Sequence, residues 1–130
     1  MKKIALLFAS LLTFTSTFAA NQNLSIKINL ERAFSHAPSQ SIANSMQTTA
    51  DNHDWTIVQD ANGSNHNTLL LSKIVGANDK QATMQFMVID LSKQPRVISN
   101  PKLIVSFNQP ANMTIANKHD KLTLSVLAHA

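Results

Sequence analysis

The chain has 130 residues, a formal net charge of +4, five histidines and no cysteine. This length suits one domain, because domains typically hold roughly 100 to 150 residues. The lack of cysteine excludes a disulfide framework, a thiolate metal site and a cysteine nucleophile. With 44% hydrophobic and 14% charged residues, the composition predicts a chain that folds around a packed core.

The N-terminus has the pattern of a secretory leader. Two lysines precede an uncharged, mostly apolar run from Ile4 to Phe14, which is shorter than the roughly 20 residues that span a bilayer. Small residues at Thr17 and Ala19 predict cleavage after Ala19, with an uncleaved N-terminal anchor as the alternative. We therefore expect a signal peptide over 1–19 and one β-rich exported domain over 20–130, either periplasmic or extracellular.

The mature chain does not have the charge pattern of a nucleic-acid binder. Loss of the two leader lysines lowers the net charge from +4 to +2, and the remaining basic residues are scattered singly. A nucleic-acid interface needs a dense basic stripe with aromatic platforms. No later segment is apolar enough to cross a bilayer. We expect no nucleic-acid partner, no cofactor and no transmembrane segment after leader cleavage.

Alternating apolar residues predict strands along most of the mature chain. Between Leu24 and Leu30, every second residue is apolar and the residues between them are polar, which is typical of a half-buried strand. Further strands are predicted at 55–58, 67–75, 81–91, 96–107, 111–115 and 122–126. Pro101 interrupts the fourth of these and belongs at a sheet edge or a bulge, because proline lacks an N–H group.

One segment favours a helix. Ile42, Met46 and Ala50 recur at every fourth position, a spacing that places them on one face of a short helix near 39–50. The fold class expected is therefore mainly β, or α+β. It is an antiparallel β-meander or sandwich-like sheet, in which short turns let each strand pair with its predecessor, with this helix on one face.

Two residues in the predicted strands need an explanation of their own. Asp90 is charged although it lies within a strand, and capping of the strand end at Ser92 explains it. Trp55 is the one tryptophan of the chain. Its place beside Ile57 favours a core position, and an anchor on a partner surface is the alternative.

The segment from Val97 to Ile115 has a pattern that the rest of the chain lacks. The positions that define it are Ser99, Pro101, Lys102, Asn108, Gln109 and Ala111. Pro101 would begin an extended strand, Asn108 and Gln109 would form a tight turn, and Ala111 would fit a close approach of two backbones. The segment resembles the strand-turn-strand signature of bacterial secretins, with Asn117 where secretins usually have glycine.

This resemblance implies a limited relationship. A secretin subunit needs several periplasmic modules and further barrel strands, for which this chain has no room. The resemblance therefore implies a small envelope protein that shares a β-hairpin with secretins and has a link to a secretion system, and it does not imply a full secretin.

Histidine and aspartate pairs are the candidates for a metal site. The pairs are His53 with Asp54 and His119 with Asp120, and His66 is a further ligand candidate. Histidine and carboxylate side chains are ordinary zinc ligands. Their spacing is not that of a known metal motif, so solvated loop histidines are the alternative. His36 and His129 are further histidines that could complete a ligand set with these pairs.

Catalytic motifs are not found. The chain has no Gly-x-Ser-x-Gly, Ser-x-x-Lys or His-Glu-x-x-His sequence, and Glu31 is its one glutamate. We therefore expect a non-enzymatic envelope protein that acts through β-edge association with another chain. A periplasmic module that binds a small ligand or a metal through the loop histidines and aspartates is the alternative.

Overall fold

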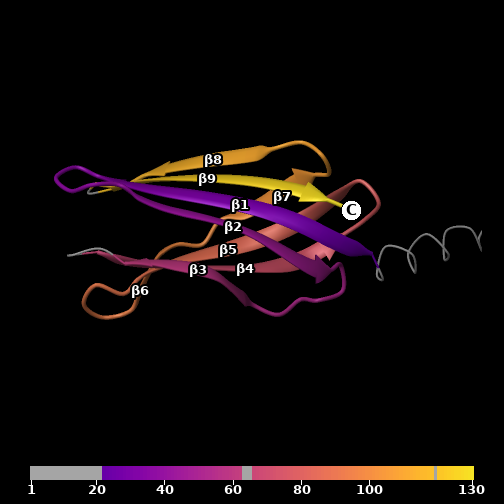
Figure 1. Cartoon of the computed structure of the whole chain (residues 1–130), viewed down its shortest axis with the longest axis horizontal. Helices are drawn as coiled ribbons and strands as arrows, with labels where there is room; N and C mark the ends of the chain where they lie inside the picture. The colour runs from indigo at the N-terminus through magenta and orange to yellow at the C-terminus, as the bar shows by residue number, and fades with distance from the viewer. Residues whose placement is uncertain (1–21, 63–65, 119) are drawn as a thin grey trace, which may run out of the picture.

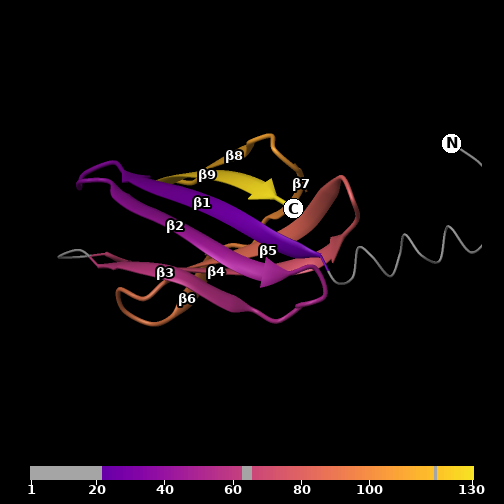
Figure 2. The same ribbon diagram turned by 45° about the vertical axis from the view of Figure 1, so that its right-hand side comes forward.

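Two antiparallel sheets pack face to face in the computed structural model, which describes residues 22–62, 66–118 and 120–130 (Figures 1 and 2). Sheet A has the strand order β2-β1-β9-β8. Sheet B has the order β3-β4-β5-β6, and β7 also pairs with β5. The expected leader and its cleavage site lie outside the described residues.

The strands of sheet A are β1 (Asn23–Phe34), β2 (Gln40–Thr49), β8 (Ala111–Ala116) and β9 (Asp120–His129). The strands of sheet B are β3 (Thr56–Asn62), β4 (Asn67–Ala77), β5 (Gln81–Asp90), β6 (Arg96–Ser99) and β7 (Lys102–Ser106). The expected mainly β, antiparallel class is thus confirmed. No helix in the described part of the chain has the length and apolar character needed to cross a membrane.

Strict alternation of side chains builds the core between the sheets. In β1 every second residue is buried, and in β5 Met84, Phe86 and Val88 point inward as their spacing predicts. Fully buried residues include Phe86 and Met84 from sheet B and Leu24, Ile26 and Val126 from sheet A. The core therefore consists mainly of aliphatic side chains and methionine, with Phe86 at its centre.

The predicted helix near 39–50 is wrong, because this segment forms strand β2, which pairs with β1. Residues four positions apart lie on the same face of a strand, because strand side chains alternate with a period of two, and they also lie on the same face of a helix. Ile42 and Met46 accordingly lie on the inward face of β2. Asn44 between them hides the alternation, since its side chain donates to the Val58 carbonyl oxygen instead of packing in the core. The high Ser and Thr content also disfavours a helix.

The chain moves between the sheets twice. Most consecutive strands within a sheet pair as a meander predicts, but β7 pairs with β5 and not with β6. In addition, β2 and β3 lie in different sheets, and so do β7 and β8. The last strand, β9, returns to pair with both β1 and β8. The prediction that each strand pairs with its predecessor therefore fails between β6 and β7 and at the two crossings, where the chain passes from one sheet to the other.

The strands define two ends of the sandwich, seen left and right in Figure 1. One end, here called the Arg32 end, holds the β1–β2 and β5–β6 connections, the end of β3 and the beginnings of β4 and β9 (Figure 1). The opposite end holds the β2–β3, β4–β5 and β7–β8 connections and the C-terminus. The pairing of β1 with β2 runs from Arg32 and Gln40 to Asn23 and Thr49, which separates the two ends by roughly 30 Å at about 3.4 Å per residue.

Candidate functional site

A buried arginine lies at the Arg32 end of the core. Arg32 continues the inward face of β1 after Leu30, and only 3% of its surface is exposed. A guanidinium buried among apolar side chains is costly unless acceptors surround it. The acceptors come from three other strands.

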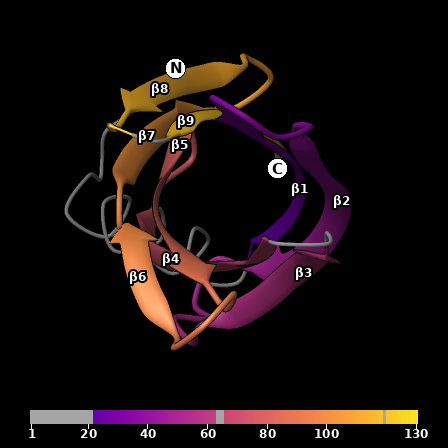
Figure 3. The same ribbon diagram turned by 90° about the vertical axis from the view of Figure 1, so that its left-hand side faces the viewer.

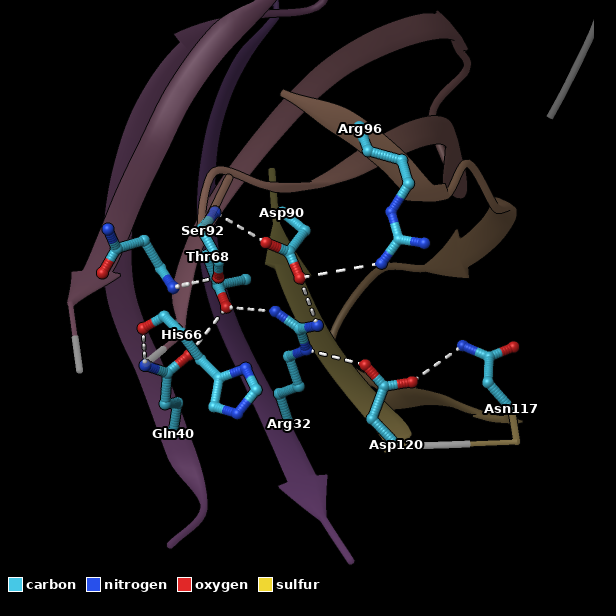
Figure 4. A network of polar contacts seen from close by, with 10 residues as sticks. Arg32, Gln40, His66, Thr68, Asp90, Ser92, Arg96, Asn117 and Asp120 are labelled. Atoms are coloured by element: carbon cyan, nitrogen blue, oxygen red, sulfur yellow. Dashed lines mark hydrogen bonds and ion pairs between the residues drawn. The ribbon is translucent and has the colours of Figure 1, made fainter. Parts of the chain in front are cut away.

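Arg32 makes hydrogen bonds to both sheets (Figure 4). Its Nε donates to Asp120 Oδ2 of β9 at 2.8 Å. Its Nη2 donates to Asp90 Oδ2 of β5 at 2.8 Å, and its Nη1 donates to Thr68 Oγ1 of β4 at 2.9 Å. One side chain therefore joins β1 and β9 of sheet A to β4 and β5 of sheet B.

Further contacts extend this network toward the surface. The Thr68 hydroxyl donates to Gln40 Oε1 at 2.7 Å, and Gln40 Nε2 donates to the His66 carbonyl oxygen at 2.6 Å (Figure 4). The Arg32 guanidinium carbon lies 4.7 Å from the centre of the Phe34 ring, which stacks on His66 at a centroid distance of 4.0 Å. The Arg32 guanidinium is thus held on several sides by hydrogen bonds and an aromatic face.

Asp90 is both buried and ionised. Burial alone would raise the pKa of Asp90, but hydrogen bonds from Arg32 and from the Ser92 backbone, together with the Arg32 charge, lower that pKa from 3.8 to about 2. The Ser92 N–H donates to Asp90 Oδ1 at 2.7 Å, so the cap predicted from sequence is present. The cap is the smaller part of the explanation, because Arg32 supplies the opposite charge.

An open cleft of about 810 Å³ lies beside this network. Arg32, Asp90 and Asp120 form part of its wall, and Phe34 and Val97 add apolar surface. Arg96 and Lys118 bring further positive charge to the cleft, and Arg96 Nη2 lies 3.9 Å from Asp90 Oδ2. Chemically, the cleft suits a small ligand with an apolar part and a negative charge.

The metal candidates divide between the two ends of the sandwich. His53 and Asp54 are exposed between β2 and β3, where His53 Nδ1 lies 2.8 Å from the Ile74 carbonyl oxygen. His66 and Asp120 lie at the Arg32 end, roughly 30 Å away at about 3.4 Å per strand residue. His119 lies outside the described residues.

The other two histidines are divided in the same way. His36 lines the cleft at the Arg32 end, and His129 contacts the Asn108 side chain at the opposite end. Among residues 22–62, 66–118 and 120–130, no group of three or more His, Cys, Asp or Glu is placed to hold a metal ion. The structure therefore does not bring the His53 and Asp54 pair together with His66 and Asp120.

The secretin-like segment forms β6, β7 and the connection to β8. The Pro101 carbonyl oxygen accepts from Phe86 N–H at 2.9 Å, and Lys102 begins β7. Asn108 has a φ of 67°, and Gln109 N–H donates to the Ser106 carbonyl oxygen at 3.2 Å, which closes a tight turn. Ser99 ends β6 and Ala111 begins β8.

The two strands beside this turn do not form the expected hairpin. β7 pairs with β5 in sheet B, whereas β8 pairs with β9 in sheet A. Each strand buries its apolar face from its own side of the core, Val105 from sheet B and Ile115 from sheet A. The turn at Asn108 therefore carries the chain from one sheet to the other.

The two lateral sides of the sandwich also differ. On one side, side chains of β2 bridge to the next segments of the chain: Asn44 donates to the Val58 carbonyl oxygen, and Gln40 donates to that of His66. On the other side, β8 is the outer strand of sheet A and pairs only with β9 among the described strands (Figure 3). β8 contains no charged residue and no proline, the usual protection of an edge strand.

Sequence reasoning missed the central member of the polar network, although a signal was present. Arg32 is in phase with the apolar residues of β1, as Asp90 is with those of β5 and Asp120 with those of β9. A charged residue in phase with a buried face must find a partner. One arginine and two aspartates at such positions in one small domain could have predicted that Arg32, Asp90 and Asp120 form a buried charged cluster.

Comparison with known proteins finds no family model that matches this chain, no similar curated protein and no similar solved structure.

Proposed function

We propose that the chain is a non-enzymatic envelope protein that associates with another polypeptide through the edge of its β-sheet. The observation that carries this proposal is the outer edge of β8, which has no strand partner among the described residues, in a strand with neither charge nor proline. An extended segment can add to such an edge through main-chain hydrogen bonds. The link to a secretion system is part of the proposal, and the resemblance of Val97 to Ile115 to secretins supports it.

The polar network supports a structural role for Asp90 and Asp120, the carboxylates that an acid and base pair would need. Arg32 donates hydrogen bonds to Asp90, Asp120 and Thr68 through three of its nitrogen atoms. Asp90 and Asp120 are therefore ion-pair partners that hold the sheets together. This arrangement suits a rigid binding scaffold better than an acid and base pair.

A lysine in β8 tests the proposal. Thr114 is exposed on β8, so Thr114→Lys puts a charge on the open edge, which disfavours strand addition. Its cross-strand partner Thr123 lies on the interior strand β9, so Thr123→Lys is the matched control. A photo-crosslinking residue at Asn112 would identify the polypeptide that pairs with β8 in envelope extracts.

The expected result is one crosslinked partner with the parent chain and with Thr123→Lys, and at least a tenfold lower yield with Thr114→Lys. Equal yields from both variants, or no partner at all, would contradict edge association. Light scattering of the purified chain shows whether that partner is a second copy.

The cleft favours a second candidate function, the binding of a small anionic ligand. Its volume of about 810 Å³ lies within the roughly 300 to 1,000 Å³ of small-molecule sites. Benzoate and inorganic phosphate are suitable anionic probes, and Zn²⁺ tests the metal form of the same idea. A rise in melting temperature that Arg96→Ala abolishes would support an anion site. No shift with any of the three probes would exclude this candidate.

A further inference from the structure

The outward faces of the two sheets differ in polarity. On sheet A, the outward residues of β1 alternate through Ser25, Lys27, Asn29 and Glu31. On sheet B, six outward positions carry large apolar side chains, beside polar residues such as Asp60, Lys73 and Gln85. The six apolar residues, here called the sheet B patch, are Ile57, Leu69, Leu71, Met87, Ile89 and Val97.

Strand register brings the patch residues together. Ile57, Leu71 and Met87 are neighbours across β3, β4 and β5. Leu69, Ile89 and Val97 form the adjacent row across β4, β5 and β6, and Asp60 of β3 ends this row beside Leu69. Ile57 is 66% exposed and Val97 is 53% exposed, so the patch is open to solvent at both sides.

We propose that the sheet B patch is the interface with a second copy of this chain, in which two sheets B pack face to face. All nine described strands belong to the two sheets, so none of them covers this face (Figure 3). Contiguous apolar surface of this kind on a folded domain marks an interaction site. This surface is separate from the β8 edge, so the inference goes beyond edge association.

The size of the face suits a weak dimer. At about 4.8 Å between strands and about 3.4 Å per residue, four strands and the stretch from Leu69 to Val75, which adds the neighbouring rows of Lys73 and Val75 to the patch, give a flat area of roughly 450 Å². A standard interface buries about 800 Å² of accessible surface on each partner. A flat projection understates the accessible area, because side chains stand out from the sheet. The dimer thus falls among the smaller interfaces, with a dissociation constant of about micromolar order or weaker.

A two-fold axis parallel to the strands makes the face complementary to itself. That axis places β4 over β5 of the second copy and keeps the rows in register, so Leu71 faces Met87 and Leu69 faces Ile89 of the second copy, while the exposed Asp60 lies at the rim of the interface. In the next row, Lys73 then faces Gln85 of the second copy. Lys102 faces Trp55 of the second copy, so no two like charges are opposed in this row. Aligned packing of this kind is the usual arrangement for two sheets.

Trp55 supplies a direct readout of this interface. It is the only tryptophan of the chain, it is 38% exposed, and its ring lies 4.8 Å from Lys73 Nζ beside the patch. Sedimentation equilibrium of the purified chain should show a reversible dimer. Over the same concentration range, the Trp55 emission should shift to shorter wavelength. Pairing through β8 leaves Trp55 in its present environment, so the two proposals fail independently.

Charged substitutions assign the face. Met87→Glu puts a carboxylate at the centre of the patch and should weaken the dimer at least tenfold. Leu127→Glu is the matched control, since Leu127 is also partly exposed on an interior strand but faces outward from sheet A. Ile57→Glu is a second variant at a position that is 66% exposed, where folding tolerates a charge.

A chain that stays monomeric up to about millimolar concentration would overturn the inference, as would a dimer that all three variants form equally well. A shift of Trp55 emission on anionic lipid vesicles without self-association would also overturn it, because the patch would then be a membrane-binding face.

Discussion

At one end of the sandwich, Arg32 holds the two sheets together. It forms ion pairs with Asp90 and Asp120, whose side chains are both almost completely buried. Removal of one member of a buried ion-pair network leaves the other members without a counter-charge. The resulting loss of folding stability exceeds the net stability that the intact ion pairs contribute. The network therefore imposes one arrangement of the two sheets at this end.

We expect Arg32→Ala to lower the free energy of unfolding by about 3 to 5 kcal/mol, because two buried carboxylates lose their shared partner. Urea denaturation followed by circular dichroism measures this. Arg96→Ala is the control: the Arg96 side chain is 71% exposed and 3.9 Å from Asp90, so its loss should cost less than about 1 kcal/mol. Equal effects of the two substitutions would argue against the network.

Asp90 makes the stability depend on pH. Its pKa falls from 3.8 to about 2 on folding, so the folded state favours the ionised carboxylate. The resulting stabilisation, about 2 kcal/mol, is present above pH 4 and is lost as the pH falls toward 2. Urea denaturation between pH 6 and pH 2 should show this loss, and Asp90→Asn should show a correspondingly shallower decrease over the same range.

At the scale of elements, the turn at Asn108 carries the chain from β7 in sheet B to β8 in sheet A. Asn108 has a φ of 67°, its N–H donates to the Ala128 carbonyl oxygen at 2.8 Å, and its side chain contacts His129. Asparagine tolerates this left-handed conformation better than other residues with a side chain. The turn is thereby fixed against the end of β9.

Asn108→Ala should lower the free energy of unfolding by about 1 to 2 kcal/mol, since it loses the His129 contact and strains the left-handed backbone. Asn108→Gly should cost less, because glycine adopts positive φ freely. Thermal unfolding of the two variants gives the comparison. Equal losses in the two variants would show that the His129 contact, which both of them lack, dominates over the backbone conformation.

The fate of β2 shows where local pattern loses to tertiary structure. Ile42 and Met46 fit a helix and a strand equally well, and Asn44 conceals the difference. Pairing of ten residues with β1 decides for the strand. A helix would leave the other edge of β1 unpaired, and unpaired edges are unfavourable.

At the scale of the whole molecule, the sandwich is closed on one lateral side and open on the other. β1, β9, β4 and β5 have neighbours on both sides, whereas β8 has one neighbour among the described strands. Amide hydrogen exchange should therefore be slowest in those four interior strands and at least tenfold faster in β8. Protection of β8 equal to that of β1 in the isolated chain would show that its edge is already covered.

Local sequence patterns specify most of the strands, the inward faces and the tight turn at Asn108, but they assign β2 to a helix. These follow from local alternation and from the backbone preferences of single residues, which need no distant partner. Asp90 also stood out, because a charge in a strand violates the local pattern.

Local patterns do not specify which strands pair, that β7 and β8 belong to different sheets, or that Arg32, Thr68, Asp90 and Asp120 meet; these features depend on the tertiary structure. These contacts join residues as far apart as Arg32 and Asp120. Local pattern specifies which face of a strand is buried but not against which other strand, because that choice depends on how the apolar faces of all strands cover one another.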